Sequence, residues 1–230
     1  MVFLIGDTHG DLSRIGSVRR RLRGEACRGD SILVLGDFGF VFNGGEKERA
    51  ALARLGRMRV TFLFVDGNHE NFDRLAEYPE EEWNGGHVHR LLPNVLHLMR
   101  GQVFRIEGHT YFTMGGAYSP DKPWRTPGRS WWAAEMPSAE EYETARRNLL
   151  DHGHKVDFIL THTAPQETTA LRGLNDPREA ELGCFLDWVQ KTTEYSGWYF
   201  GHVHRDRVLW RRQTAVFDEV VRITPKPTGK

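Results

Sequence analysis

Residues that can bind metal ions follow five short apolar runs of this chain, each at the point where the run ends. They are Asp7 and His9, Asp37, Asn68 and His69, His162, and His202 and His204. Carboxylate oxygen together with imidazole nitrogen is the ligand mixture of Mn²⁺, Fe or Zn²⁺, and no thiolate lies nearby to suggest a structural zinc finger. A lone histidine is usually structural, but five such groups together predict a metal centre.

The spacing within two of these groups favours chelation. In a strand, residues two apart point to the same side. Asp7 with His9, and His202 with His204, could therefore each present both side chains to one ion.

Three of the apolar runs, residues 2–5, 31–35 and 60–65, are typical of strands buried on both faces. Helical patterns separate them, the first beginning after Asp11 as N-cap and the second spanning residues 46–57. This order predicts a βαβαβ unit with parallel strands. Ligands of such sheets gather beyond the carboxyl ends of the strands, so we expect the candidate metal ligands to converge there.

The rest of the chain predicts a single domain over residues 1–224 with a frayed tail at 225–230. Short strands are expected at 95–98, 102–106, 111–114, 156–160 and 198–200, and helices at 138–150 and 177–191. Residues 115–137 form a segment rich in proline and tryptophan that is too long for a simple connection. We expect this segment to be a loop at the substrate site.

Composition restricts the partners. Lysine plus arginine (31) balance aspartate plus glutamate (31), so no overall field steers the chain to nucleic acid or to an anionic membrane. No apolar run approaches the roughly 20 residues of a membrane span. Cys27 and Cys184 lie outside any metal-binding spacing and are expected to be reduced thiols. We expect a cytoplasmic protein with no membrane partner, and the oligomeric state stays open.

The ordered motifs resemble those of the calcineurin-like metallophosphoesterases. They are Asp7-Thr8-His9, Gly36-Asp37, Gly67-Asn68-His69-Glu70, Thr161-His162 and Gly201-His202-Val203-His204, and they cover residues 6–204. The resemblance implies an α/β fold, a four-layer αββα sandwich with a mixed sheet around the βαβαβ metal-binding core. It also implies two metal ions at the strand ends, one shared carboxylate, and hydrolysis of phosphate esters.

By position, the resemblance assigns a role to each ligand. The first metal would be held by Asp7, His9 and His204, the second by Asn68, His162 and His202, and both by Asp37. Two divalent ions with two aspartates would leave the centre at about +2, which attracts an anion. We expect Mn²⁺ first, with Fe or Zn²⁺ as alternatives. Metal-bound hydroxide would attack phosphorus while His69, not itself a ligand, assists the leaving group.

The chain departs from the family directly after the bridging aspartate. Many members continue with Asp-Arg, which orient the catalytic histidine and hold phosphate, whereas this chain has Phe38-Gly39-Phe40-Val41. Asp66 and Glu70 are the nearest candidates to orient His69. We hypothesise that the 115–137 loop replaces the missing phosphate contact. Its candidates are Lys122, Arg125 and Arg129, and the alternative is that these are solvated surface charges.

The sequence therefore predicts a dinuclear metal-dependent hydrolase of small phosphomonoesters or phosphodiesters. A nuclease is the alternative within enzymes, and we expect it less because the charge is balanced and no appended DNA-binding segment is recognised. A non-catalytic interaction scaffold on the same fold is the alternative from another class. The complete set of candidate ligands, with His69 present, argues against that scaffold.

Overall fold

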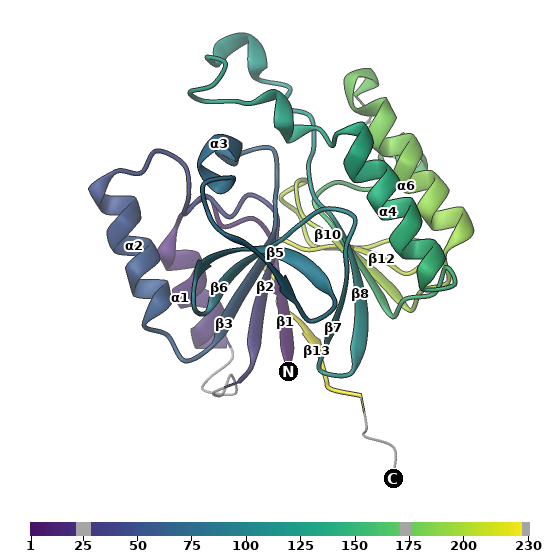
Figure 1. Cartoon of the computed structure of the whole chain (residues 1–230), viewed down its shortest axis with the longest axis horizontal. Helices are drawn as coiled ribbons and strands as arrows, with labels where there is room; N and C mark the ends of the chain where they lie inside the picture. Colours follow the sequence, from purple (N-terminus) through teal and green to yellow (C-terminus); the bar gives the residue numbers. More distant parts are fainter. Residues whose placement is uncertain (22–28, 171–175, 227–230) are drawn as a thin grey trace.

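The computed structural model describes residues 1–21, 29–170 and 176–226, and its centre is a pair of β-sheets (Figure 1). The first sheet has the order β13 (Val221–Ile223), β1 (Val2–Ile5), β2 (Ser31–Leu35), β3 (Thr61–Val65), β6 (Val95–Leu98), β5 (Gly86–Leu92) and β4 (Glu80–Trp83). The second has the order β11 (Arg207–Val208), β12 (Gln213–Ala215), β10 (Gly197–Phe200), β9 (Phe158–Thr161), β8 (His109–Met114) and β7 (Val103–Ile106). Cys27 and the tail residues 227–230 lie outside the described residues.

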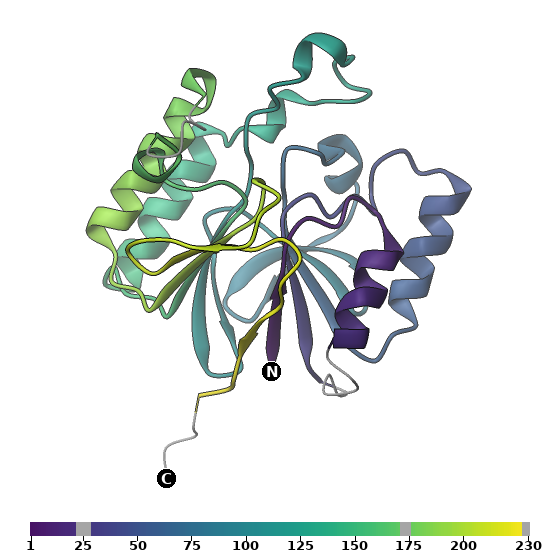
Figure 2. The same ribbon diagram turned by 180° about the vertical axis from the view of Figure 1, so that it is seen from behind.

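Helices cover the outer face of each sheet. The pair α1 (Leu12–Arg21) and α2 (Glu46–Gly56) flanks the first sheet, and the pair α4 (Ala139–Asp151) and α6 (Ala180–Thr192) flanks the second (Figures 1 and 2). Two shorter helices, α3 (Phe72–Leu75) and α5 (Gln166–Ala170), lie in the connections. Single 3₁₀ turns occur at Lys122–Trp124, Ala133–Glu135 and Pro177–Glu179.

Alternation along the buried strands explains the layering. In β1, Phe3 and Ile5 pack with residues of α1 and α2, while Val2 and Leu4 face the second sheet. A third apolar cluster lies between the second sheet and the helices α4 and α6. Burying both faces of each sheet in this way makes four layers. The predicted αββα sandwich is therefore confirmed.

Both sheets are mixed. In the first, β1, β2, β3 and β6 run parallel to one another, β13 and β5 pair antiparallel with β1 and β6, and β4 pairs antiparallel with β5. In the second, β12, β10, β9 and β8 are parallel, with β7 and β11 antiparallel. The parallel strands of each sheet therefore end on one side of the molecule.

Local sequence signals place two of the helices. The Ser138 hydroxyl accepts a hydrogen bond from the Glu141 N–H, and the Glu141 carboxylate accepts one from the Ser138 N–H, which is the predicted start of α4. At α1, the Asp11 carboxylate accepts a 2.7 Å hydrogen bond from the Ser13 N–H, as expected of an N-cap. None of the described helices is long and apolar enough to cross a membrane.

The 115–137 segment rises above the carboxyl ends of the strands, between the two helix pairs (Figures 1 and 2). Buried polar contacts fix its base. The Arg100 guanidinium donates to the Ala134 and Glu135 carbonyls and pairs with the Asp66 carboxylate at 2.6 Å. The segment is thus held over the place where the candidate metal ligands meet.

Candidate metal centre

The candidate ligands gather in the loops that follow β1, β2, β3, β9 and β10. Four of them have left-handed backbone conformations, with φ of 48° at His9, 49° at Asp37, 63° at His202 and 48° at His204. Such conformations cost about 1–3 kcal/mol and concentrate at functional sites. The backbone thus turns sharply at these residues to aim their side chains inward.

These turns correct one step of the sequence argument. β1 ends at Ile5 and β10 at Phe200, so the pairs Asp7 with His9 and His202 with His204 lie beyond their strands. Their side chains do converge, but the alternation of a strand is not the reason. The left-handed turn at His9 and His204 brings the second member of each pair back beside the first.

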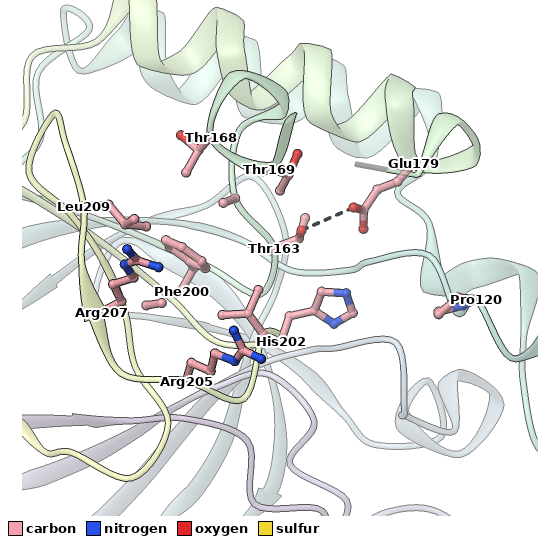
Figure 3. A pocket seen from close by; sticks show the side chains of 13 residues that line it. Pro120, Thr163, Thr168, Thr169, Glu179, Phe200, His202, Arg205, Arg207 and Leu209 are labelled. Carbon is pink, nitrogen blue, oxygen red and sulfur yellow. Dashed lines mark hydrogen bonds between the residues drawn. The ribbon is translucent and has the colours of Figure 1, made fainter. Parts of the chain in front are cut away.

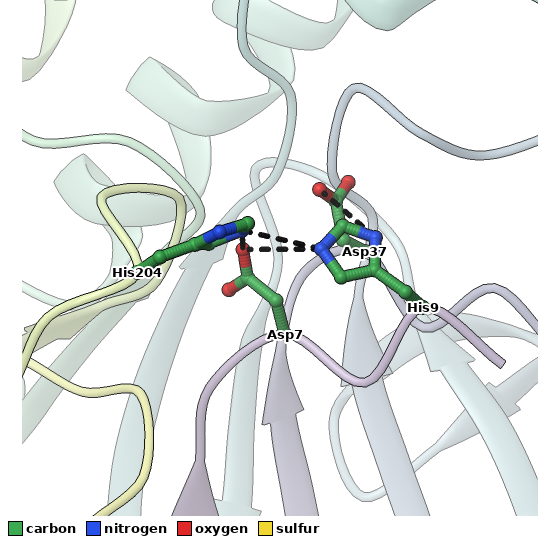
Figure 4. A group of neighbouring side chains, drawn as sticks. All are labelled: Asp7, His9, Asp37 and His204. Carbon is green, nitrogen blue, oxygen red and sulfur yellow. Dashed lines mark hydrogen bonds and ion pairs between the residues drawn. The ribbon is translucent and has the colours of Figure 1, made fainter. Parts of the chain in front are cut away.

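Asp7, His9, Asp37 and His204 form the first group (Figure 4), whose donor atoms all lie within 4.8 Å of one another. His204 Nε2 is 2.9 Å from Asp7 Oδ2, and His9 Nε2 is 3.2 Å from His204 Nε2. Two atoms bound to one ion at about 2.1 Å cannot be more than about 4.2 Å apart. The group therefore has close to the spacing that one divalent ion needs.

Asp7 carries the strongest sign that a cation belongs here. Its side chain is fully buried, and Oδ2 makes no hydrogen bond of acceptable geometry although His204 Nε2 lies near. Burial alone would raise the pKa of Asp7, but His204, His162 and the His202 N–H outweigh it and lower the pKa to about 2. A buried, ionised oxygen without a hydrogen bond is a fit for a metal ion.

The second group consists of Asn68, His162 and His202. His162 Nδ1 is 2.8 Å from the Leu35 carbonyl, which requires the proton on Nδ1 and leaves the lone pair on Nε2. That Nε2 is 3.1 Å from Asn68 Oδ1. Two acceptors facing each other need a cation or an extra proton between them. The His202 ring lies against His162 with ring centroids 4.9 Å apart.

Asn68 is oriented by the loop above it. Its Nδ2 donates a 3.0 Å hydrogen bond to the hydroxyl of Ser119, a fully buried residue of the 115–137 segment. The amide oxygen is thereby turned toward His162. Sequence reasoning did not identify Ser119, because a serine in a loop carries no signal until its partner is known.

Asp37 lies between the two groups. Its Oδ2 is 3.8 Å from His9 Nδ1 in the first group, and its Oδ1 is 3.5 Å from His162 Nε2 in the second. Oδ1 also accepts a 2.8 Å hydrogen bond from the His69 N–H, which fixes the carboxylate. One carboxylate thus faces both sets of donors.

Glycines make room for this packing. A Cβ on Gly67 would lie 2.1 Å from Asp37 Oδ1, and one on Gly201 would lie 2.3 Å from Asp7 Oδ1. Both distances are shorter than the contacts that Cβ atoms make in proteins, so a side chain at either position would push a candidate ligand away. The glycine before Asn68 and the glycine before His202 are therefore part of the site.

The histidines of the second group differ in their electrostatics. Burial, with His162 adding to it, lowers the pKa of His202 to about 4, so this imidazole is neutral at pH 7. Burial also opposes the charge on His162, but the Asp37 and Asp7 carboxylates outweigh it and raise the pKa of His162. The pocket is thus negative enough to attract a cation to His162 Nε2.

His69 lies beside the first group without joining it. Its ring centroid is 5.6 Å from that of His9, and Arg125 Nη2 is 3.4 Å from His69 Nε2. Burial lowers the pKa of His69, and the Arg125 and His9 side chains add to this effect against the attraction of Asp37. In the free protein its imidazole is therefore mainly neutral near pH 7.

The three cations of the loop prove to have different surroundings. Arg125 is aimed at the site, since its Nη2 lies 3.4 Å from His69 Nε2. Its Nε donates to Asp121 and its Nη1 to the Ser130 carbonyl, which holds the guanidinium in place. The Lys122 ammonium instead pairs at 2.6 Å with the buried Glu135 and lies over the Tyr118 ring. Arg129 is exposed and does not line the cavity that contains His69 and Arg125.

Neither acid suggested as an orienter of His69 contacts its ring among the described interactions. The Asp66 carboxylate binds Arg100 and His97. The Glu70 carboxylate accepts hydrogen bonds of 2.6 Å from the Phe38 N–H and 3.3 Å from the Gly39 N–H. Glu70 therefore shapes the backbone after Asp37, where many family members have Asp-Arg.

Two cavities flank the centre. One of about 430 Å³ is lined by His9, His69 and Arg125 together with Phe40 and Phe42. The other, of about 470 Å³, begins at His202 and extends beneath α5. Each cavity thus adjoins at least one candidate metal ligand.

Comparison with known families supports the same chemistry. The family model described as calcineurin-like phosphoesterase matches residues 1–206 of the chain. The match includes every candidate metal ligand and His69. None of the curated proteins compared with the chain matches it significantly.

Proposed function

This chain belongs to the calcineurin-like phosphoesterase family, and we propose that it is a dinuclear metal-dependent hydrolase of phosphomonoesters or phosphodiesters. The position of Asp37 supports this most directly, because its two oxygens face two separate donor groups. Two bound divalent ions would supply the positive charge that holds a phosphoryl group and would lower the pKa of water.

The donor sets suggest which residues would hold each ion. Asp7, His9 and His204 would hold the first, Asn68, His162 and His202 the second, and Asp37 would contribute to both. All are oxygen or nitrogen donors, a set that suits Mn²⁺, our first choice, and also Fe or Zn²⁺.

His69 and Arg125 would act on the substrate itself. A bound phosphate ester brings negative charge next to His69, which raises its pKa and favours the protonated imidazole. That proton could then pass to the departing oxygen of the ester. Arg125, held by Asp121 and Ser130, would donate hydrogen bonds to a phosphate oxygen.

A substrate panel assayed with added Mn²⁺ tests the proposal. The panel contains p-nitrophenyl phosphate, bis-p-nitrophenyl phosphate, cyclic nucleotides and single-stranded DNA. Turnover of the small esters that is abolished by EDTA supports the proposal. Cleavage of DNA alone would make the chain a nuclease, and no turnover by the metal-loaded protein would favour a non-catalytic scaffold.

A further inference from the structure

The cavity that begins at His202 is distinct from the one lined by His69. Its volume of about 470 Å³ is in the range of small-molecule binding sites. Figure 3 shows Arg205 and Arg207 along one side and Thr168, Thr169 and Glu179 along the other. The cavity is thus continuous with the second donor group and separate from the one beside His69.

Two arginines give this cavity its charge. Arg205 and Arg207 are exposed and have no hydrogen-bond or ion-pair partner among the described residues. Other exposed arginines nearby are paired, Arg211 with Glu167 at 3.2 Å and Arg178 with Asp176 at 2.7 Å. Two free guanidinium groups at the edge of one cavity are suited to an anion.

The carboxylate that lines the cavity, Glu179, is turned toward other partners. Glu179 Oε1 accepts a 2.9 Å hydrogen bond from the Tyr118 N–H, and Oε2 accepts one of 3.3 Å from the Thr163 hydroxyl. Its residue is only 8% exposed. Both oxygens are therefore hydrogen-bonded within the protein, and neither forms an ion pair with Arg205 or Arg207 among the described residues.

The inner wall is apolar. Phe200, Val203 and Leu209 line it, and Phe200 is almost completely buried. Such a wall favours an organic ring, because removing apolar area from water is favourable. Wall and arginines together match a group that combines a ring with a negative charge.

We infer that this cavity binds the retained arm of a phosphodiester and prefers an arm that carries a further anionic group, as a nucleotide does. The inference rests on the proposed function, since it places the phosphorus at the centre. The leaving group would then lie toward His69 and the retained arm against Arg205 and Arg207. Water would supply the new P–O bond, and the bond to the leaving oxygen would break.

Three chromogenic substrates with the same leaving group test the inference. They are p-nitrophenyl phosphate, thymidine 5′-(p-nitrophenyl phosphate), and the same diester with a 3′-phosphate. The variants are the double substitution Arg205→Ala with Arg207→Ala, and Arg59→Ala. Arg59 is a matched control because it is also exposed but precedes β3, at the opposite end of the strands. Release of nitrophenolate, measured with added Mn²⁺, reports hydrolysis of the p-nitrophenyl ester and is not affected by hydrolysis of the 3′-phosphate.

We expect the double variant to lose at least about tenfold more kcat/KM on the 3′-phosphorylated diester than on p-nitrophenyl phosphate, as the loss of charged hydrogen bonds predicts. Lysine at both positions should restore part of the difference, and Arg59→Ala should not show it. Equal losses on all three substrates, or no loss, would overturn the inference.

A binding measurement separates failure of this inference from failure of the proposed function. Isothermal titration with thymidine 3′,5′-bisphosphate needs no turnover. If the wild type hydrolysed nothing, binding that weakens about tenfold in the double variant would still support the cavity. Unchanged binding would refute it.

Discussion

At the residue scale, substitutions should separate the role of Asp37 in metal binding from the role of His69 in catalysis. Asp37→Ala removes the carboxylate that faces both donor groups, so we expect bound metal and activity to be lost together. His69→Ala should keep the metal, because its ring belongs to neither group, but should reduce kcat by about 10²–10⁴-fold, the usual value of a proton donor. Metal analysis of the purified variants with kcat on p-nitrophenyl phosphate measures both. A His69→Ala variant as fast as wild type would rule out its role.

Arg125 and Lys122 should also respond differently. Arg125→Ala should raise KM about tenfold through the loss of a charged hydrogen bond, with little change in stability. Lys122→Ala leaves the buried Glu135 without its cation and should lower the free energy of unfolding by about 3 kcal/mol. Arg129→Ala, exposed and away from the cavity, is the control. Steady-state kinetics and urea unfolding distinguish the three, and equal KM for Arg125→Ala and wild type would exclude the phosphate contact.

These residues also show where sequence reasoning ends. Each candidate ligand could be identified from its place after an apolar run and from the family motifs. The three loop cations could not be ranked, because their difference depends on partners such as Glu135 and Ser130 that are distant or unremarkable in sequence. The role of Glu70 could not be predicted either. Its position next to His69 in the sequence suggested a contact with that ring, but its carboxylate instead accepts a hydrogen bond from the Phe38 N–H.

At the element scale, the strongly patterned elements were predicted and the weak ones were not. β1, β2 and β3 are continuous apolar runs, and the structure places them within one residue of the predicted bounds. β4 has three consecutive glutamates, Glu80 to Glu82, at an edge of the sheet and carries no such signal. Helices α3 and α5 have four and five residues, too few for a helical period to be recognised. Their existence depends on tertiary contacts.

Asp157 offers a test of how the second sheet is held together. It precedes β9, and its carboxylate accepts hydrogen bonds from the Thr110 N–H at 2.8 Å and from Lys226. Burial alone would raise the pKa of Asp157, but these bonds lower it below its ordinary value of 3.8. The stabilisation is therefore present above about pH 4 and is lost as the pH falls through the lowered pKa.

Asp157→Asn should thus lower the free energy of unfolding by about 1–2 kcal/mol at pH 7. The difference from wild type should shrink as the pH approaches 2–3. Urea unfolding across this pH range measures it. Glu194→Gln is the control, because Glu194 and Lys155 form an exposed pair whose loss should have a much smaller effect on stability. A difference that grows on acidification would contradict the assignment.

At the scale of the whole molecule, the candidate centre lies across the junction of the two sheets. Asp7, Asp37 and Asn68 follow strands of the first sheet, and His162, His202 and His204 follow strands of the second. Each donor group contains members from both sheets. Bound ions would therefore link the two halves of the sandwich in addition to serving the chemistry.

This arrangement predicts that metal stabilises the entire fold. A ligand that binds only the native state adds RT ln(1 + [L]/Kd), about 2.7 kcal/mol at 100 times Kd. For a chain of 230 residues, that corresponds to a rise in Tm of about 5–10 °C. Thermal unfolding after EDTA treatment, with and without Mn²⁺, measures the rise, and Asp37→Ala should abolish most of it. Since Asp7 and Asn68 are supplied by the first sheet and His162 by the second, Mn²⁺ should also slow hydrogen exchange in β1 and β9 together. Protection confined to one sheet would show that the ions do not link the two.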